Sequence, residues 1–397
     1  MNVKVRKQSF YLVICFLLSP LLALGGIFVE IYNKKKYAIL IFSFFISICA
    51  YIYIPSGDLY RYYLLYTQYK DFSFFEMITD YHLDFIVYIL IWGAAKLELG
   101  HAIVRFILVL LCSLMYFNII QKISLQYIRN NKTFFCFFIL SFFYFPFLSI
   151  LTGLRFGAGL AFAFVSTYYS FVEYRKIKGF IFLLFSAFFH FSFIVLLPIW
   201  LLALNSKIII SRWTVIISCI LILCFNTVLL SNFSIFDDFL IYNKMEAYSS
   251  GDDYIDTVSP LLRLILYLPR FLSVPVLFYI LFKEEPSKMR NYLFYLMILV
   301  CLFSPFETPF GRYLSVLFLF SFLGYLSDYR IKECNYWKVL LLCSMFSFLL
   351  QIMPLYKSIK LTNYPSLLYT PYPIAFFKTY ETEWINEHVG TTGEILN

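Results

Sequence analysis

The sequence predicts an all-α polytopic membrane protein with about 11 to 13 transmembrane or re-entrant helices. Of the 397 residues, 61% are hydrophobic and only 14% are charged, whereas about a quarter of the residues in a soluble domain are charged. Apolar runs of about 20 residues, the length that crosses roughly 30 Å of hydrocarbon, recur along the whole chain. We therefore expect a single polytopic membrane domain over residues 1–397.

The apolar runs are separated by short polar connections. They cover 10–31, 37–54, 84–99, 101–121, 134–151, 154–172, 179–203, 213–231, 261–282, 291–304, 312–328 and 338–353. The first run starts like a signal peptide but continues without a small-residue cleavage site, which predicts a retained first helix. Longer polar stretches at 56–83 and 232–260, and a tail over about 354–397, are the expected outer loops and outer C-terminal tail.

Basic residues gather in the short connections and predict the topology. The connections rich in Lys and Arg are 32–36, 121–132, 173–178, 205–212, 283–290 and 328–338. The positive-inside rule predicts that all of them are cytoplasmic. Strict alternation of complete spans cannot achieve this, so two segments must be non-spanning or broken. The short 84–99 and the long 179–203 are the candidates, and interrupted helices occur where they line an enclosed cavity.

Charge and cysteine usage exclude several classes of protein. The net charge of +9 is spread over loops instead of one face, so it indicates topology and not nucleic-acid binding. The nine cysteines lie mainly inside apolar runs, where a thiol packs as a small hydrophobe. We expect no disulfide framework, no metal site and no cofactor.

Two apolar runs contain ionisable residues. Arg155 follows Gly153 in "LTGLRFGAGLAFAF", where small residues every fourth position allow a neighbouring helix to approach closely. Arg155 is either a snorkelling interfacial arginine or a phosphate ligand. His190 lies within "LLFSAFFHFSFIVLLP", and it is either a neutral hydrogen-bonded histidine or a general base.

Further arginines lie at the predicted outer ends of other segments. Arg263 and Arg270 share one helix face, and "SPFETPFGRYLSV" places Arg312 and Tyr313 after a break, where Arg312 pairs with Glu307 or binds a ligand. The stretch "YIPSGDLYRYYLLY" adds Asp58, Arg61, Tyr60 and Tyr62. Positive-inside bias depletes arginine on the outer face, so Arg61, Arg155, Arg263, Arg270 and Arg312 together predict a cationic pocket for an anion. The pairs Asp237-Asp238 and Asp252-Asp253 are interpreted as solvated loop residues.

These residues resemble the EpsG-type family of Wzy-like polysaccharide polymerases. The resemblance rests on the outer loop with Asp58 and its tyrosines, on "LRFGAGLAFAF" followed by "YRKIKGF", on "SAFFHFSFIVLLP", and on the Arg312-Tyr313 turn. It covers most of the chain and is most specific over 151–198. The family commonly has Gln after the arginine of the second motif, so no role is carried over to Phe156 or Gly157.

The resemblance implies glycosyl transfer at the outer face of a bacterial cytoplasmic (inner) membrane, in O-antigen, capsule or exopolysaccharide synthesis. A glycan would move from undecaprenyl diphosphate to the non-reducing end of a lipid-linked repeat unit, with no nucleotide. Arg155 and Arg312 would contact the diphosphate, and His190 or Asp58 would be the base. Arg61, Arg263, Arg270, Glu307, Tyr60, Tyr62 and Tyr313 are the expected substrate-binding residues.

Other functions remain open at this point. A polyprenyl-phosphate-sugar-dependent glycosyltransferase would also use an early outer-loop acid such as Asp58. A flippase or transporter for lipid-linked glycans would keep intramembrane arginines, although the sequence lacks an internal repeat. The expected partners are the undecaprenyl-diphosphate-linked oligosaccharide and membrane lipid, with a chain-length regulator protein as a further candidate, and not nucleic acid.

Overall fold

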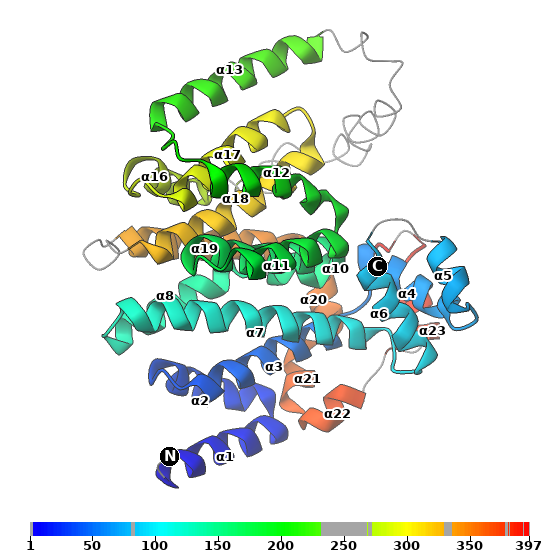
Figure 1. Cartoon of the computed structure of the whole chain (residues 1–397). Helices are drawn as coiled ribbons and strands as arrows, with labels where there is room; N and C mark the ends of the chain where they lie inside the picture. Colours follow the sequence, from blue (N-terminus) through cyan, green and yellow to red (C-terminus); the bar gives the residue numbers. More distant parts are fainter. Residues whose placement is uncertain are drawn as a thin grey trace. The chain divides into compact units, whose positions relative to one another are not determined.

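A computed structural model describes residues 3–80, 84–231, 268, 272–328, 336–377, 380, 382–391 and 393–396. These residues form α-helices, short 3-10 turns and a π turn, and one isolated β-bridge joins Val389 and Ile395. The prediction of an all-α protein is confirmed (Figure 1).

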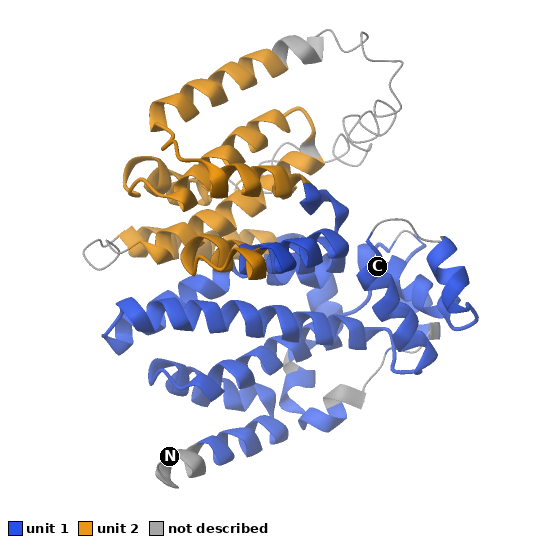
Figure 2. Cartoon of the chain, in the orientation of Figure 1, with its two compact units in different colours: residues 1–166, 180–194, 352–397 blue, residues 167–179, 195–351 orange. Residues whose placement is uncertain are grey.

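The chain divides into two compact units (Figure 2). Unit 1 comprises residues 1–166, 180–194 and 352–397, and unit 2 comprises 167–179 and 195–351. The sequence-based expectation of a single domain stays a prediction. Both units are interleaved in sequence, because the chain leaves unit 1 twice and returns to it twice.

Each unit is a set of packed helices. Unit 1 contains α1 (Val3–Leu18), α2 (Pro20–Tyr32), α3 (Lys36–Ile52), α4 (Asp58–Tyr69), α5 (Phe74–Asp80), α6 (Phe85–Lys96), α7 (Ala102–Tyr127), α8 (Asn131–Tyr144), α9 (Phe147–Thr152), most of α10 (Leu154–Thr167) and α11 (Lys176–Phe189), and α20 (Tyr356–Thr362), α21 (Tyr364–Tyr369), α22 (Tyr372–Phe377) and α23 (Thr382–His388). Unit 2 contains α12 (Leu196–Asn205), α13 (Arg212–Ser231), α16 (Val274–Phe282), α17 (Lys288–Leu302), α18 (Glu307–Ser327) and α19 (Tyr336–Ile352).

The helices have the length and composition of membrane spans. In the described part of the chain, 4 stretches are long and apolar enough to cross a membrane, namely Ala102–Tyr127, Asn131–Thr152, Thr308–Ser327 and Tyr336–Thr362. Shorter apolar helices accompany them, including Pro20–Tyr32 and Lys36–Ile52. The protein is therefore a polytopic membrane protein, as its composition predicts.

The first apolar run differs from the prediction of one helix over 10–31. The chain breaks between α1 and α2, where Ser19 has an extended backbone and its hydroxyl accepts a hydrogen bond from the backbone N–H of Leu22. Pro20 has no N–H to donate, so it fits the first position of a new helix. A serine followed by proline is a helix start that an apolar window does not detect.

Both segments that the topology singled out are irregular. Helix α6 has 12 residues, or about 18 Å of axial length, too little to cross the hydrocarbon core. The run 179–203 is interrupted at His190, between the end of α11 and a 3-10 turn over Phe191–Val195. The predicted break is confirmed, and it falls at the histidine instead of at Pro198.

The basic connection before α3 and the basic connection after α7 lie together at one end of unit 1. Lys34, between α2 and α3, donates to the carbonyls of Ile128 and Arg129 beyond the end of α7, at 3.1 and 2.5 Å. Helices α3 and α7 therefore run in opposite directions, and α4, α5 and α6 connect their other ends. This places 84–99 beside one end of the spans, as a non-spanning segment requires.

Candidate active site

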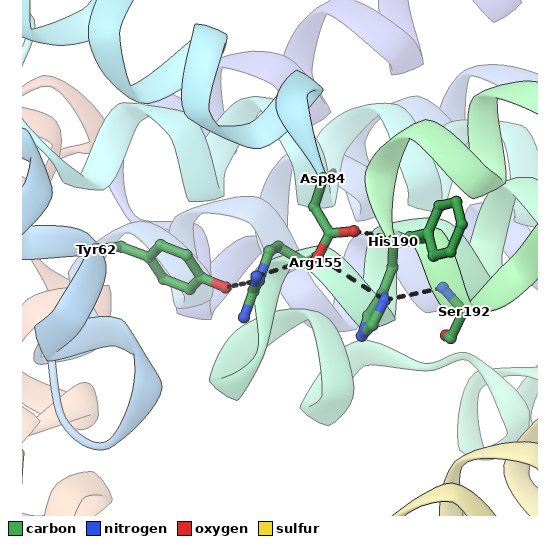
Figure 3. A network of polar contacts seen from close by, with 6 residues as sticks. Tyr62, Asp84, Arg155, His190 and Ser192 are labelled. Carbon is green, nitrogen blue, oxygen red and sulfur yellow. Dashed lines mark hydrogen bonds and ion pairs between the residues drawn. The ribbon is translucent and has the colours of Figure 1, made fainter. Parts of the chain in front are cut away.

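Four side chains from separate helices of unit 1 meet in one polar network (Figure 3). Tyr62 comes from α4, Asp84 precedes α6, Arg155 belongs to α10, and His190 follows α11. Asp84 lies at the centre of the network, with its side chain 8% exposed. The centre of the network is therefore a carboxylate that is not among the residues predicted from the sequence.

Arg155 is the second residue of α10 and pairs with Asp84. Its Nη1 lies 3.0 Å from Asp84 Oδ2, and its Nε donates to the hydroxyl of Tyr62 at 2.8 Å. A cation in the first turn of a helix is disfavoured by the helix dipole, and the nearby carboxylate offsets this. The side chain is 33% exposed, so the guanidinium reaches both the carboxylate and the surface.

His190 occupies the break between α11 and the 3-10 turn. Its Nδ1 accepts a hydrogen bond from the Ser192 backbone at 3.4 Å and lies 3.8 Å from Asp84 Oδ2. The rings of Phe156 and Phe193 meet its imidazole edge to face, with centroids 5.8 and 6.2 Å away. The other ring nitrogen points away from Asp84 (Figure 3).

Asp84 holds the interrupted helix in place as well as the arginine. Its Oδ1 accepts the backbone N–H of Phe191, the first residue of the 3-10 turn, at 2.6 Å. One carboxylate thus neutralises Arg155 and satisfies a donor that the helix break exposes. The sequence does contain a signal for this residue. Asp84 is an acid at the first position of the apolar segment 84–99, which is too short to span the membrane.

Tyr62 and Tyr88 form the aromatic side of the network. The Arg155 guanidinium lies 5.9 Å from each ring centroid, a distance at which cation–π attraction operates. Burial raises the pKa of Tyr62 to about 12, and the Arg155 charge opposes that shift. Tyr62 is therefore a neutral hydroxyl throughout the physiological pH range.

Glycines allow the helices of the network to approach closely. A Cβ on Gly157 would lie 2.3 Å from the backbone nitrogen of Ile150, and one on Gly159 would lie 2.6 Å from the ring of Phe193. The sequence predicted a small-residue face through Gly157, and the preceding short helix α9 is what packs there. Gly159 brings α10 against the turn that follows His190.

Asp58 and Arg61 lie at the surface of α4. Their side chains are 57% and 78% exposed and form a pair at 3.7 Å. Tyr60 and Tyr62 face inward and are each 7% exposed, and Tyr60 packs with Tyr63, Ile385 and Val389. Helix α4 therefore carries its charged residues outward and its tyrosines into the protein.

The remaining predicted residues belong to unit 2 or lie outside the described residues. Arg312 and Tyr313 are in α18, where the Tyr313 ring stacks on Phe303 with centroids 4.8 Å apart. Glu307 begins α18, and its side chain is outside the described part of the chain. Arg263 and Arg270, like Asp237-Asp238 and Asp252-Asp253, also fall outside it.

The network has the components of an acid–base and anion-binding site. It joins an imidazole, a carboxylate that faces one imidazole nitrogen, and a partly exposed guanidinium within hydrogen-bonding distance of that carboxylate. Such an arrangement can move a proton at the imidazole and stabilise negative charge at the guanidinium.

Comparison with known proteins agrees with the resemblance seen in the sequence. No curated protein and no solved structure matches the chain. The sequence model of the EpsG family matches residues 35–372, a range that includes Tyr62, Asp84, Arg155 and His190. Because this match covers most of the chain, the protein belongs to the EpsG family.

Proposed function

We propose that the protein is a polysaccharide repeat-unit polymerase. It transfers a glycan from undecaprenyl diphosphate to the non-reducing end of a lipid-linked repeat unit, at the outer face of the bacterial cytoplasmic membrane. Membership of the EpsG family supports a glycosyl-polymerase-like membrane protein at the family level. The observation that carries the finer proposal is the Asp84, Arg155 and His190 network.

The reaction assigns a role to each member of this network. The acceptor hydroxyl oxygen bonds to the anomeric carbon of the donor sugar, and its proton passes to His190. The bond between that carbon and the diphosphate oxygen breaks, and its electron pair leaves with the diphosphate. Arg155 stabilises the added negative charge, because a guanidinium matches phosphate oxygens geometrically. Asp84 positions Arg155 directly, and it positions His190 through its hydrogen bond to the backbone of the next residue, Phe191.

The other predicted residues take supporting roles in this proposal. Arg61, exposed on α4, and Arg312, on α18, remain candidate ligands for the anionic substrate, together with Arg263 and Arg270. Tyr60, Tyr62, Tyr313 and Glu307 remain candidate substrate-binding residues. Asp58 is the alternative base, but its carboxylate pairs with Arg61 at the surface, so we favour His190.

The positions of the basic loops indicate which side of the membrane the site faces. Lys34 and the residues after α7 lie together at one end of unit 1, and α4 and α6 connect the opposite ends of α3 and α7. The positive-inside rule assigns the basic end to the cytoplasm. The network would then face the outside, where lipid-linked repeat units are joined.

Deletion of the gene tests the proposal in cells. We expect surface glycan to accumulate as single repeat units on the lipid carrier, and the wild-type gene to restore long chains. Arg155→Lys keeps the charge but loses the planar fork, so it should restore few long chains. The same substitution at the exposed Arg129 is the matched control. Normal chain lengths in the deletion strain would overturn the proposal.

A further inference from the structure

A second arginine of unit 1, Arg105, is fully buried, and within the described part of the chain neither of its terminal nitrogens, Nη1 and Nη2, has a hydrogen-bonding partner. It lies in the first turns of α7 with 2% of its surface exposed. Arginine is almost never fully buried unless it is paired. A guanidinium that has lost both its water and its counter-ion is among the least stable arrangements in a protein interior.

The surroundings of Arg105 are polar but uncharged. Its electrostatic neighbours are Tyr51 and Tyr53 at the end of α3, and Tyr364 and Tyr380 from the C-terminal segment. The Tyr53 hydroxyl and His101 Nε2 also lack hydrogen-bonding partners among the residues that the structure describes. Burial and the Arg105 charge lower the pKa of His101 to about 3, so its imidazole is neutral. Within the described part of the chain, these neighbours supply no negative charge.

The depth of Arg105 suits the headgroup of a lipid. It is the fourth residue of α7, about 5 Å along the helix axis from its start. The 26 residues of α7 extend about 39 Å, several ångströms more than the hydrocarbon core. Arg105 therefore lies near the boundary between hydrocarbon and headgroups, at the end of α7 away from the Lys34 contacts.

We propose that Arg105, Tyr53 and His101 form a binding site for the phosphate group of a lipid. The guanidinium supplies the charge and paired donors that phosphate oxygens accept, and the tyrosine hydroxyl supplies a further donor. Tyr364 and Tyr380 donate to the carbonyls of Cys49 and Ile52, each at 2.8 Å. Tyr364 and Tyr380 are thus held at the end of α3 beside Arg105. Because Arg105 is only 2% exposed, residues around it must shift for the phosphate to enter.

The site shares no residue with the Asp84 network, and it does not depend on the proposed polymerase activity. Two sources provide the same chemistry, namely a polyprenyl diphosphate and an ordinary glycerophospholipid. Both can be measured by binding alone, so a failure here is distinguishable from a failure of the polymerase proposal.

Native mass spectrometry of the purified full-length protein tests the site. The protein is titrated separately with undecaprenyl diphosphate, phosphatidylglycerol and undecaprenol, which has the same tail without phosphate. Arg105→Met should weaken binding of at least one phosphate lipid by tenfold or more and leave undecaprenol unchanged. Arg129→Met, at an exposed arginine beyond the other end of α7, should bind all three lipids as the wild type does.

The pattern of loss identifies the source. A loss confined to undecaprenyl diphosphate identifies the polyprenyl carrier, and a comparable loss for phosphatidylglycerol identifies membrane phospholipid. Unchanged binding of both phosphate lipids by Arg105→Met overturns the proposal. If Arg105→Met does not fold, Arg105→Lys and Tyr53→Phe decide the question, and wild-type affinity in both variants would overturn it equally.

Discussion

Asp84 is the side chain on which the geometry of the candidate site depends. Its carboxylate accepts hydrogen bonds from Arg155 and from the Phe191 backbone. The oxygen that faces Arg155 also lies 3.8 Å from His190 Nδ1. Hydrogen bonds to charged groups contribute about 1.5–3 kcal/mol each. A change at this residue therefore removes the counter-ion of Arg155 and a hydrogen bond to the residue after His190 at once.

We expect Asp84→Asn to lower kcat/KM for glycan elongation about 10- to 100-fold, because the amide keeps the shape but loses the charge. Elongation of lipid-linked repeat units by membranes containing each variant measures this. Asp71→Asn, at an exposed aspartate after α4, is the control. If Asp58→Asn abolished elongation while Asp84→Asn did not, the assignment of the carboxylate would be wrong.

Some residues of this site can be predicted from the sequence, and others cannot. Arg155 and His190 were identifiable because ionisable groups inside apolar runs are costly and therefore conspicuous. Asp84 lies at the edge of its run, where an acid resembles ordinary loop sequence. Asp58 has the same appearance, and only the packing of α4 shows that its carboxylate faces outward.

A buried acid in unit 2 makes stability depend on pH. Burial, and then the nearby Asp328 carboxylate, raise the pKa of Glu284 from 4.5 to about 8, while Arg290 opposes the shift. The folded protein therefore holds this proton more tightly than the unfolded chain does. Its stability should fall as pH rises from about 4.5 to 8.

Glu284→Gln removes this dependence. The variant should melt about 3–8 °C above the wild type at pH 8.5, and at the same temperature as the wild type at pH 4.5. Thermal unfolding of the purified protein at both pH values measures the difference. Glu285→Gln changes the adjacent exposed residue and serves as the control. An equal gain at both pH values would show that the effect is not titration of Glu284.

At the scale of the helix, α10 determines how Arg155 and His190 meet. Gly159 lies against the Phe193 ring, and the Ser186 hydroxyl of α11 donates to the Gly159 carbonyl at 2.7 Å. The His190 backbone N–H donates in turn to the Ser186 carbonyl at 3.0 Å. The position of the histidine thus depends on the close approach of α10 and α11.

Gly159→Ala should displace the turn after His190, because its Cβ would lie 2.6 Å from a buried ring. We expect about 1–3 kcal/mol of destabilisation and a marked loss of elongation. Thermal unfolding and elongation by the same preparation separate the two effects. Gly93→Ala in α6 is the matched control, since nothing lies within 4 Å of its added Cβ. Equal behaviour of the two variants would contradict the role of Gly159.

Hydrophobic pattern predicted the helices better than their breaks. The interruption of 179–203 was expected because the run was too long and contained His190. The break at Ser19-Pro20 was not predicted. The hydrophobicity of residues 10–31 is the same whether the segment forms one helix or two. The sequence predicts that a neighbouring helix packs closely against α10 at Gly157. It does not identify α9 as that helix, because sequence periodicity does not encode which elements pack together.

At the scale of the whole chain, the C-terminal segment returns to unit 1 and holds α4. Tyr60 and Tyr63 of α4 pack with Ile385 and Val389, and the Gly57 N–H donates to the Gly393 carbonyl at 2.8 Å. The sequence assigned this tail to the outer face as a polar extension. Its contacts with α4, the helix that carries Tyr62, involve residues more than 300 positions apart and were not predictable.

Gly393→Ala should loosen this attachment. Gly393 has a φ of +89°, and an added Cβ would lie 2.6 Å from the Gly57 carbonyl oxygen. We expect faster proteolysis in the connection between α3 and α4, where Gly57 lies, and reduced elongation. Gly100→Ala introduces a similar backbone strain at a φ of +80° without a close neighbour, so it isolates the contact with Gly57. Proteolysis equal to that of Gly100→Ala would contradict this role for the tail.

The most direct test of the central claim is the rate of elongation by purified protein in liposomes supplied with its lipid-linked repeat unit. His190→Gln keeps hydrogen-bonding capacity but cannot take the acceptor proton. The account predicts that it lowers kcat by 10²- to 10⁴-fold, with little change in KM. A His190→Gln enzyme that elongates at the wild-type rate would contradict the assignment of His190, and with it the proposed active site.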